Sequence, residues 1–399
     1  MSMNRESHAK KPAGATRNVP NAANLELWVR SGGRCANCNK FLLEEPFCER
    51  PINLGERAHI AGWKDSPGSP RGGSSVPLSE RNKVANLILL CQDCHTIIDD
   101  GDLRVEYPEE RLLEIKRGHE ERIHHLTSMS SDRETSVLRV FSAIRGSVPE
   151  LAREQAMRAV IDGAGRYARF PLSVDRYGIE LDLTHLSGPE EMGEIYWREG
   201  IRKIDGVAER VAEAVHEKHI RHVSIFALAR IPFLVYLGYA LDDKVPVDLY
   251  QKHRGADEGW VWPEEGGGHV FEFSELRPGG ADQDVAVLLS LSGSVHLSDV
   301  PGDLGSSAVY ELRPRGATPN PNLFRSRATL DSFVRVYQDL LVSLEQTNKR
   351  AGCVHLFPAV PVTAAIAVGR SLMRGVHPAL TVYERIGDGF FPAVTINKR

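Results

Sequence analysis

The sequence has 399 residues, too many for a single hydrophobic core, so we expect two or three domains. Its 49 lysines and arginines nearly balance 53 aspartates and glutamates, which excludes a cationic coat over the whole surface. No apolar run is long enough to cross a membrane and no signal core follows Met1, so the expected compartment is the cytoplasm and no membrane partner is expected.

The chain opens with a polar segment, residues 1–24, that contains Lys10, Lys11 and Pro12 and predicts a disordered arm. A short helix is predicted over residues 25–30. Up to residue 90 the chain holds 13 lysines and arginines against 8 aspartates and glutamates. This local excess suits a track for DNA phosphates, and it equally suits a solvated basic face.

Two C-x-x-C pairs follow, Cys35-Ala-Asn-Cys38 and Cys91-Gln-Asp-Cys94. Only Cys48 and Cys353 lie elsewhere in the chain, so chance pairing is the weaker explanation. Four thiolates form the closed donor set of a structural zinc site, and unoxidised thiols agree with a reducing compartment. Because the pairs lie far apart in the sequence, we expect the residues between them to form a substantial excursion.

That excursion and the residues after it carry side chains suited to phosphodiester hydrolysis. His59 precedes Asn86, an apolar run (87–90) predicts a buried strand, and His95 lies on the helix expected next. A histidine serves as general base, an asparagine orients an imidazole or its neighbour, and a second histidine binds a divalent cation. Asp99 lies one helical turn after His95, where its carboxylate suits Mg²⁺.

Residues 25–126 resemble an HNH endonuclease domain of the four-cysteine subtype. The resemblance implies a ββα-metal fold with zinc on the cysteines, His59 as base, Asn86 as the orienting residue and His95 at the catalytic magnesium. Many members carry Asp before the base histidine, where this chain has Ala58. The cation must then rely on His95, Asp99 and water, or on Glu56. The alternative is a module that keeps zinc and binds DNA without cleaving it.

The turn-rich loop over residues 65–80 either meets DNA or moves on activation, or it is an inert insertion. A helix is predicted from Tyr107 to about Leu126, and the serine-rich start of 127–150 predicts a linker between domains. From 151 to 399, strands alternate with helices, which predicts parallel sheets covered by helices in an α/β domain. The predicted helices are 149–161, 204–219, 330–346 and 362–373, and the predicted strands are 223–229, 285–291, 354–360 and 379–384.

This second half contains a weak internal repeat. Val223-Ser-Ile-Phe226 matches Val354-His-Leu-Phe357, and Gly238 matches Gly369, all at an offset of 131 residues. We interpret the repeat as a duplicated Rossmann-like module, although any two βαβ units share such features. Ligands of parallel sheets bind beyond the carboxyl ends of strands, which places the expected phosphate sites at loops 229–232 and 360–363.

The segment His355-Leu-Phe-Pro-Ala-Val-Pro-Val-Thr-Ala-Ala-Ile-Ala-Val-Gly-Arg370, followed by Leu380-Thr-Val-Tyr-Glu384, resembles the end of a SAVED domain. This resemblance implies two fused CARF-like units that sense cyclic oligonucleotides made during phage infection. HNH followed by SAVED is the domain order of nuclease effectors in CBASS antiphage systems. Because double-strand breaks require two active sites, we expect a homo-oligomer, a dimer or, once activated, a tetramer.

The candidate contacts to a cyclic di- or trinucleotide fall into two groups. Cationic and hydroxyl side chains would hold phosphates, and aromatic side chains would stack on bases, although each aromatic residue could instead belong to the core. The phosphate candidates are Arg230, Thr363 and Arg370, and the stacking candidates are Trp197, Tyr236 and Trp260 (or Trp262).

Together these features predict a latent, Mg²⁺-dependent endonuclease of double-stranded DNA with little sequence specificity, activated when a cyclic oligonucleotide binds the second half. Two alternatives remain open. One is a restriction nuclease that reads a modified base, and the other is a non-catalytic zinc-containing DNA-binding regulator with a small-molecule sensor. Substitution of His59 distinguishes a nuclease from a regulator.

Overall fold

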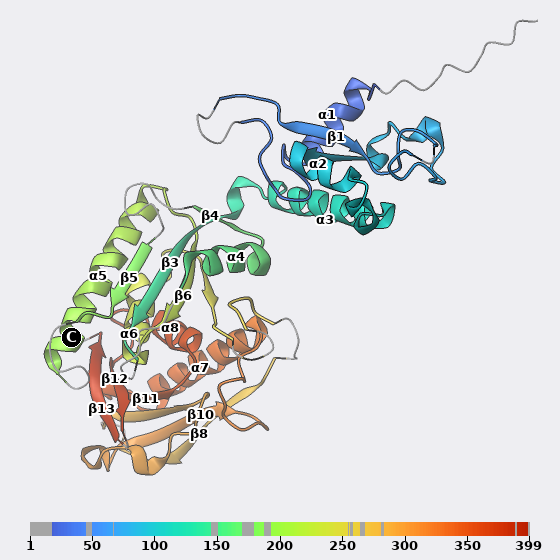
Figure 1. Cartoon of the computed structure of the whole chain (residues 1–399). Helices are drawn as coiled ribbons and strands as arrows, with labels where there is room; N and C mark the ends of the chain where they lie inside the picture. The colour runs from blue at the N-terminus through green and yellow to red at the C-terminus, as the bar shows by residue number, and fades with distance from the viewer. Residues whose placement is uncertain are drawn as a thin grey trace, which may run out of the picture. The chain divides into compact units, whose positions relative to one another are not determined.

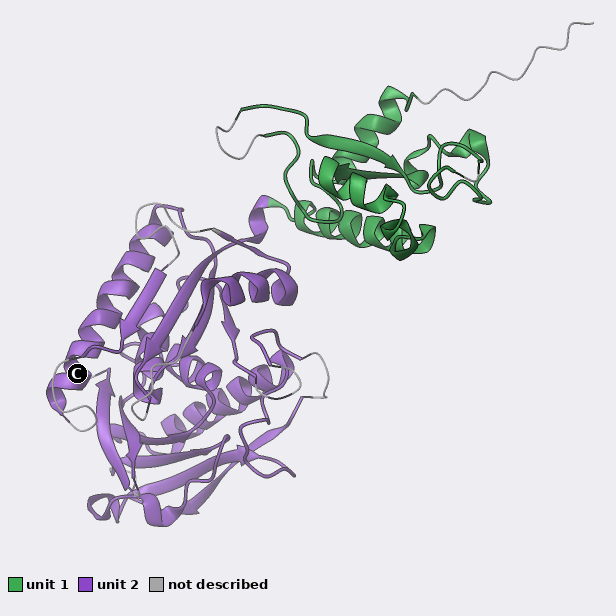
Figure 2. Ribbon diagram, in the orientation of Figure 1, with its two compact units in different colours: residues 1–130 green, residues 131–399 purple. Residues whose placement is uncertain are grey.

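The computed structural model of the chain divides into two compact units, residues 1–130 and 131–399 (Figure 2). The structure describes residues 18–44, 50–66, 68–144, 151–169, 179–186, 193–253, 255, 258–263, 268–280, 283–387 and 389–397. Most of the predicted arm (1–17), Cys48 and the end of the predicted linker (145–150) lie outside them. Among the described residues, no helix is both long and apolar enough to span a bilayer.

The first unit is built on a two-stranded antiparallel sheet followed directly by a helix (Figure 1). β1 (Gly55–His59) pairs with β2 (Leu87–Cys91), with His59 opposite Leu87. Every residue of β2 is buried, as its apolar run predicts, and α2 (Gln92–Asp99) begins at the next residue. α1 (Asn21–Arg30) and α3 (Glu109–Thr127) complete the unit, and α1 starts inside the segment that we expected to be disordered.

The second unit begins within the predicted linker, because β3 (Glu134–Ser142) is a buried strand there. The strand was not predicted because polar residues interrupt its apolar run, namely Thr135, Ser136 and Arg139. All three are nevertheless buried, and Thr135 Oγ1 lies 2.8 Å from His222 Nδ1 in a neighbouring segment. The linker prediction is therefore wrong for these residues.

β3 lies inside a five-stranded sheet that is parallel throughout. The order is β4, β3, β6, β7, and β5 also pairs with β3 on the same side as β4. The helices α4, α5 and α6 belong to this half (Figure 1). The bounds are β4 (Tyr167–Arg169), β5 (Ile179–Leu183), β6 (Val223–Leu228), β7 (Val247–Tyr250), α4 (Arg153–Ala164), α5 (Glu194–His216) and α6 (Ile231–Leu241).

The other half of this unit holds a six-stranded sheet in the order β13, β12, β11, β9, β10, β8. Its interior pairs are parallel, as predicted, but β8 and β13 pair antiparallel at the two edges. β13 starts three residues after β12 ends, and a connection this short permits only antiparallel pairing. The bounds are β8 (Phe271–Arg277), β9 (Val285–Ser290), β10 (Ala308–Pro314), α7 (Arg327–Thr347), β11 (Cys353–Ala359), α8 (Val362–Arg370), β12 (Ala379–Ile386) and β13 (Gly389–Ile396).

The internal repeat is visible in the structure. α6 begins at Ile231 and α8 at Val362, so the offset of 131 residues separates the two helices as well. In both halves the strand before the helix lies between two parallel neighbours, and the strand after the helix pairs beside it. One large apolar core contains residues of both sheets.

The two repeated helices touch through their backbones at the two matched glycines. A Cβ atom on Gly238 would lie 2.0 Å from the carbonyl oxygen of Ile366, and one on Gly369 would lie 1.9 Å from that of Val235. Only glycine permits this approach at either position. The reciprocal contact, Gly238 on α8 and Gly369 on α6, indicates a pseudo-two-fold axis between the helices.

Candidate functional site

The four cysteines of the two C-x-x-C pairs converge in the first unit. Their sulfur atoms lie within 4.8 Å of one another, and Cys38 Sγ is 3.7 Å from Cys91 Sγ. A tetrahedral zinc ion with Zn–S bonds of about 2.3 Å requires sulfurs about 3.8 Å apart, so the donor set fits zinc in type and spacing. The Asn37 side chain and the Cys94 amide donate to Cys94 Sγ and Cys91 Sγ, as second partners of metal-bound thiolates do.

A separate cavity of about 440 Å³ in the first unit gathers most of the predicted catalytic side chains. His59 lies at the end of β1, and His95 and Asp99 lie on α2. His95 hydrogen-bonds Glu56 through Nδ1, and its Nε2 lies 3.3 Å from Asp99 Oδ2. The cavity therefore offers two carboxylates and an imidazole, a donor type that suits a divalent cation.

The charges around His95 shift its titration and that of Asp99. The hydrogen bond to Asp99 raises the pKa of His95, burial lowers it and Glu56 raises it, with a net upward shift. Burial raises the pKa of Asp99, but His95 and Arg71 lower it further, so the net shift is downward. The two carboxylates therefore stabilise the cationic form of this imidazole relative to that of a free histidine.

Asn86 acts on the backbone beside His59 rather than on its imidazole. The side chain is buried, accepts a hydrogen bond from the Ala61 amide at 2.8 Å and donates to the Ala61 carbonyl at 3.1 Å. A third bond, at 3.0 Å, reaches the carbonyl of Arg81. Asn82 Oδ1 is the atom that lies 3.0 Å from His59 Nε2. Of the two positions that we expected for Asn86, the imidazole or its neighbour, the side chain bonds the neighbouring backbone, while Asn82 contacts the imidazole.

Arg71, from the turn-rich loop, is a second residue that the sequence analysis missed. Its guanidinium donates to the carbonyls of Ile60 at 2.7 Å and Ile98 at 2.8 Å, and its Nη2 lies 2.6 Å from Asp99 Oδ1. It joins the segment after β1 to the end of α2. Arg71 thus ties the loop to both elements that carry the histidines, although a single arginine among many glycines and serines gives no sequence signal for this role.

In the second unit, two of the predicted ligand residues lie at the N-termini of the repeated helices. Arg230 precedes α6 and pairs with Glu384 on β12, with Nη1 3.0 Å from Oε1. Thr363 lies in the first turn of α8, and its hydroxyl donates to Gln251, just after β7, at 2.9 Å. Each helix start in one half is thus bonded to the strand end of the other half.

The other four predicted ligand residues lie elsewhere. Trp197 is buried against Phe233, and Trp260 is 2% exposed beside Phe226, so neither presents a face to a base. The hydroxyl of Tyr236 donates to Asp205 at 2.8 Å in the middle of α6. In the sequence, Trp197 and Tyr236 have the same helical spacing as core residues. The stacking prediction is not supported for Trp197, Tyr236 or Trp260.

Arg370 ends α8, about 10 Å along the helix from Thr363 at a rise of 1.5 Å per residue. Its Nη2 donates to the carbonyl of Val245 at 3.3 Å. Both residues belong to the segment that resembles a SAVED domain, but they lie at opposite ends of α8. Arg370 therefore does not join the phosphate site that we expected at Thr363.

Residues 204–396 match the family model described as SMODS-associated and fused to various effectors sensor domain, or SAVED. This finding confirms the predicted SAVED domain over those residues and makes this part of the chain a sensor domain. A search of the curated proteins found no match.

The structure is similar to those of Cap4 SAVED/CARF-domain receptors. The Acinetobacter baumannii receptor with the cyclic trinucleotide 2'3'3'-cAAA has a TM-score of 0.45 and 15% identity over 72% of this chain, and with 3'3'3'-cAAA the values are 0.46, 15% and 76%. The Moraxella osloensis receptor has a TM-score of 0.38 and 17% identity over 57% of this chain. The alignments cover 62%, 66% and 49% of those proteins, respectively, so this chain spans less than two thirds of their length.

Proposed function

We propose that this chain, whose residues 204–396 form a SAVED sensor domain, is a DNA endonuclease activated by a cyclic oligonucleotide. Its first unit would hydrolyse duplex DNA with little sequence specificity, as an HNH effector of a CBASS antiphage system. One observation carries the catalytic half of the proposal: a single cavity is lined by His59, Glu56, His95 and Asp99.

His59 is the general base in this proposal. Because the Oδ1 atom of Asn82 can only accept, the ring nitrogen Nε2 donates to it and Nδ1 carries the lone pair. Nδ1 removes a proton from water, the oxygen attacks phosphorus, and the ester bond to the leaving oxygen breaks. Asn86 supports this step by holding the backbone two residues after the base.

Two metals would assist. Zinc would be held by the four cysteines and would stabilise the fold of the first unit. Magnesium would be held by His95 with Asp99, which lies beside Nε2, or with Glu56, which lies beside Nδ1, and water would complete its ligands. It would stabilise the negative charge on the leaving oxygen. Glu56 would replace the aspartate that many HNH domains carry at the position of Ala58, because both residues lie on β1 and Glu56 hydrogen-bonds His95.

The sensor half would bind a cyclic oligonucleotide at the N-termini of α6 and α8. Unpaired amides at a helix start favour phosphate, and the pseudo-two-fold arrangement supplies two such sites for a ligand with several phosphates. The Arg230–Glu384 pair lies there, and a phosphate would compete with Glu384 for the guanidinium. Ligand binding would select an oligomer, a dimer or a tetramer, in which two active sites can cut both DNA strands.

Plasmid degradation with Mg²⁺ tests the proposal. The protein is incubated alone and with a panel of cyclic di- and trinucleotides that includes 2'3'3'-cAAA and 3'3'3'-cAAA. We expect cleavage only with one member of the panel. Cleavage without any ligand would favour a restriction nuclease, and no cleavage by zinc-loaded protein would favour the DNA-binding regulator.

A matched pair of variants tests the role of His59 as the general base. His59→Ala should lower the cleavage rate by at least a hundredfold while zinc content and ligand binding stay unchanged. His125→Ala, on the exposed surface of α3, should cleave like the native protein. Equal rates for both variants would remove His59 from the mechanism.

A further inference from the structure

One position of the pseudo-two-fold repeat is occupied differently in the two halves of the second unit. In the second half, β13 lies along the outer edge of β12 and contacts α5 and α6. The offset of 131 residues relates α5 to α7 and α6 to α8, since α5 ends at His216 and α7 at Thr347. The position equivalent to that of β13 is therefore the space between β7, α7 and α8.

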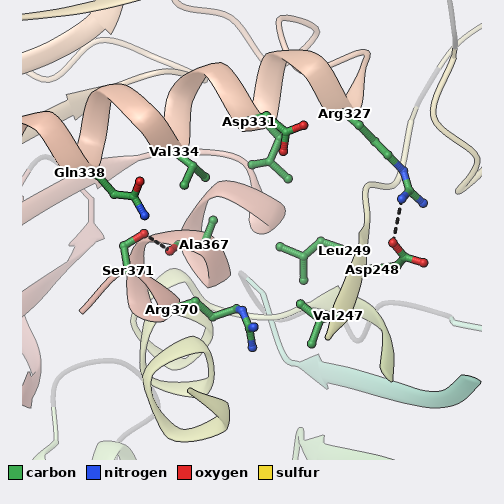
Figure 3. Close-up of a pocket in the computed structure, with 11 residues that line it drawn as sticks. Val247, Asp248, Leu249, Arg327, Asp331, Val334, Gln338, Ala367, Arg370 and Ser371 are labelled. Atoms are coloured by element: carbon green, nitrogen blue, oxygen red, sulfur yellow. Dashed lines mark hydrogen bonds and ion pairs between the residues drawn. The ribbon is translucent and has the colours of Figure 1, made fainter. Parts of the chain in front are cut away.

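In the first half this position holds a cavity rather than a strand. β7 is the last strand of its sheet, and beside it lies a cavity of about 420 Å³ lined by β7, one side of α7 and the end of α8 (Figure 3). Its volume is within the usual range for small-molecule sites. The apolar part of the lining comes from Val247, Leu249, Leu330, Val334 and Ala367.

Two arginines that line this cavity carry buried donors without partners. Arg327 Nη1 pairs with Asp248 Oδ1 at 2.7 Å, but its Nη2 is buried and makes no hydrogen bond. Arg370 Nη2 donates to Val245, while its buried Nη1 makes none. A buried unpaired guanidinium N–H costs free energy that an anionic acceptor removes.

The acidic groups nearby leave these donors unsatisfied. Asp248 is shared among Arg327, Arg166 and His222, and Asp331 on the cavity wall is exposed. Asp242 and Asp243 interact with the Arg370 charge only through space. No carboxylate of the described residues therefore reaches Nη2 of Arg327 or Nη1 of Arg370.

We propose that this cavity binds a small organic anion, with its carboxylate or phosphate on Arg370 and its apolar body against α7 and β7. A strand added to β7 fits less well, because the Leu249 carbonyl already accepts from Trp262 Nε1 at 3.0 Å. The site is separate from the helix N-termini proposed for the cyclic oligonucleotide and does not depend on that proposal.

Calorimetric titration of the full-length protein with phenyl phosphate and with benzoate, in buffer free of phosphate, tests the site. We expect at least one probe to bind with a millimolar or lower Kd, and the preferred probe identifies phosphate or carboxylate as the anion. Arg370→Gln should raise the Kd tenfold or more, and Arg370→Lys, which keeps the charge, should raise it less. Failure of both probes to bind the native protein below 10 mM overturns the proposal.

Two controls locate the binding. Arg335→Gln removes an exposed arginine from α7 that does not line the cavity, and it should leave the Kd unchanged. Thr363→Val alters the start of α8 and should also leave it unchanged. A loss with Thr363→Val equal to that with Arg370→Gln would place the probe at the helix N-termini and contradict the proposal. Circular dichroism spectra of the variants verify that each one is folded.

Discussion

The two units of this protein are stabilised by different means. The first has a small apolar core around β2, and much of its chain forms loops held by buried polar side chains such as Asn86, Arg71 and Arg81. The second has two sheets and a large continuous core. A small core needs additional cross-links. Here side-chain bonds to backbone carbonyls supply some of them, and zinc on the four clustered cysteines would supply another. The stability of the first unit should therefore depend most on its cysteines and buried polar groups, and that of the second on how closely its helices and sheets pack.

The largest effect should come from disruption of the four-cysteine cluster, which we propose holds zinc. Cys94→Ser, or a chelator added to the native protein, should unfold the first unit, because structural zinc contributes on the order of 10 kcal/mol to small metal domains. Calorimetry should show the loss of one transition while that of the second unit stays at its native temperature. Loss of both transitions together would mean that the units do not fold independently.

A smaller effect, now in the second unit, should come from the helix contact at the matched glycines. Gly369→Ala should lower the free energy of unfolding by about 3 kcal/mol, because the new methyl group meets the backbone of α6. Gly206→Ala on α5, where a Cβ meets no atom within 4 Å, should instead be neutral or stabilising by up to about 1 kcal/mol. Urea unfolding measures both, and equal destabilisation would contradict the close approach.

Asn86→Ala should separate stability from catalysis in the first unit. The loss of three buried hydrogen bonds should lower its stability by about 2 to 3 kcal/mol. Asn82→Ala should cost less than about 1 kcal/mol, since Asn82 is only half-buried, yet it should slow cleavage by releasing His59. Thermal unfolding and plasmid cleavage of both variants provide the comparison. A stable but slow Asn86→Ala would reverse the two roles.

The smallest effect is a pH dependence confined to the second unit. Burial lowers the pKa of His222 to about 4, although Asp248 opposes the shift. The unfolded chain therefore binds a proton before the folded one, and stability should fall as the pH drops from 6.5 towards 4. Between pH 7 and pH 5 the loss should be about 2 kcal/mol. His222→Gln should flatten this dependence in urea titrations at the two pH values, and an unchanged slope would assign it to another group.

The features predicted correctly from sequence are those with a local pattern. The C-x-x-C pairs converge, the apolar run before Cys91 is a buried strand, and the offset of 131 residues corresponds to a repeat in the structure. Each rests on a spacing that physical chemistry permits in few other ways.

The predictions that failed depend on partners far away in sequence. β3 was missed because its buried polar residues bond to segments beyond residue 150, and Trp197 was expected to stack because an aromatic residue on a helix has no mark of its burial. Asn82 and Asn86 are both asparagines on one short segment, and only the fold shows which of them contacts the imidazole.

The backbone contact between α6 and α8, made at Gly238 and at Gly369, limits which cyclic ligands could bind. Side chains at a helix interface can change rotamer and let the helices slide, but two backbones in contact leave no such adjustment. The contact therefore fixes the distance between the starts of α6 and α8 within the second unit. A cyclic ligand that touches both starts must match that distance, so the number of nucleotides in the ring would be selected more strictly than the identity of the bases.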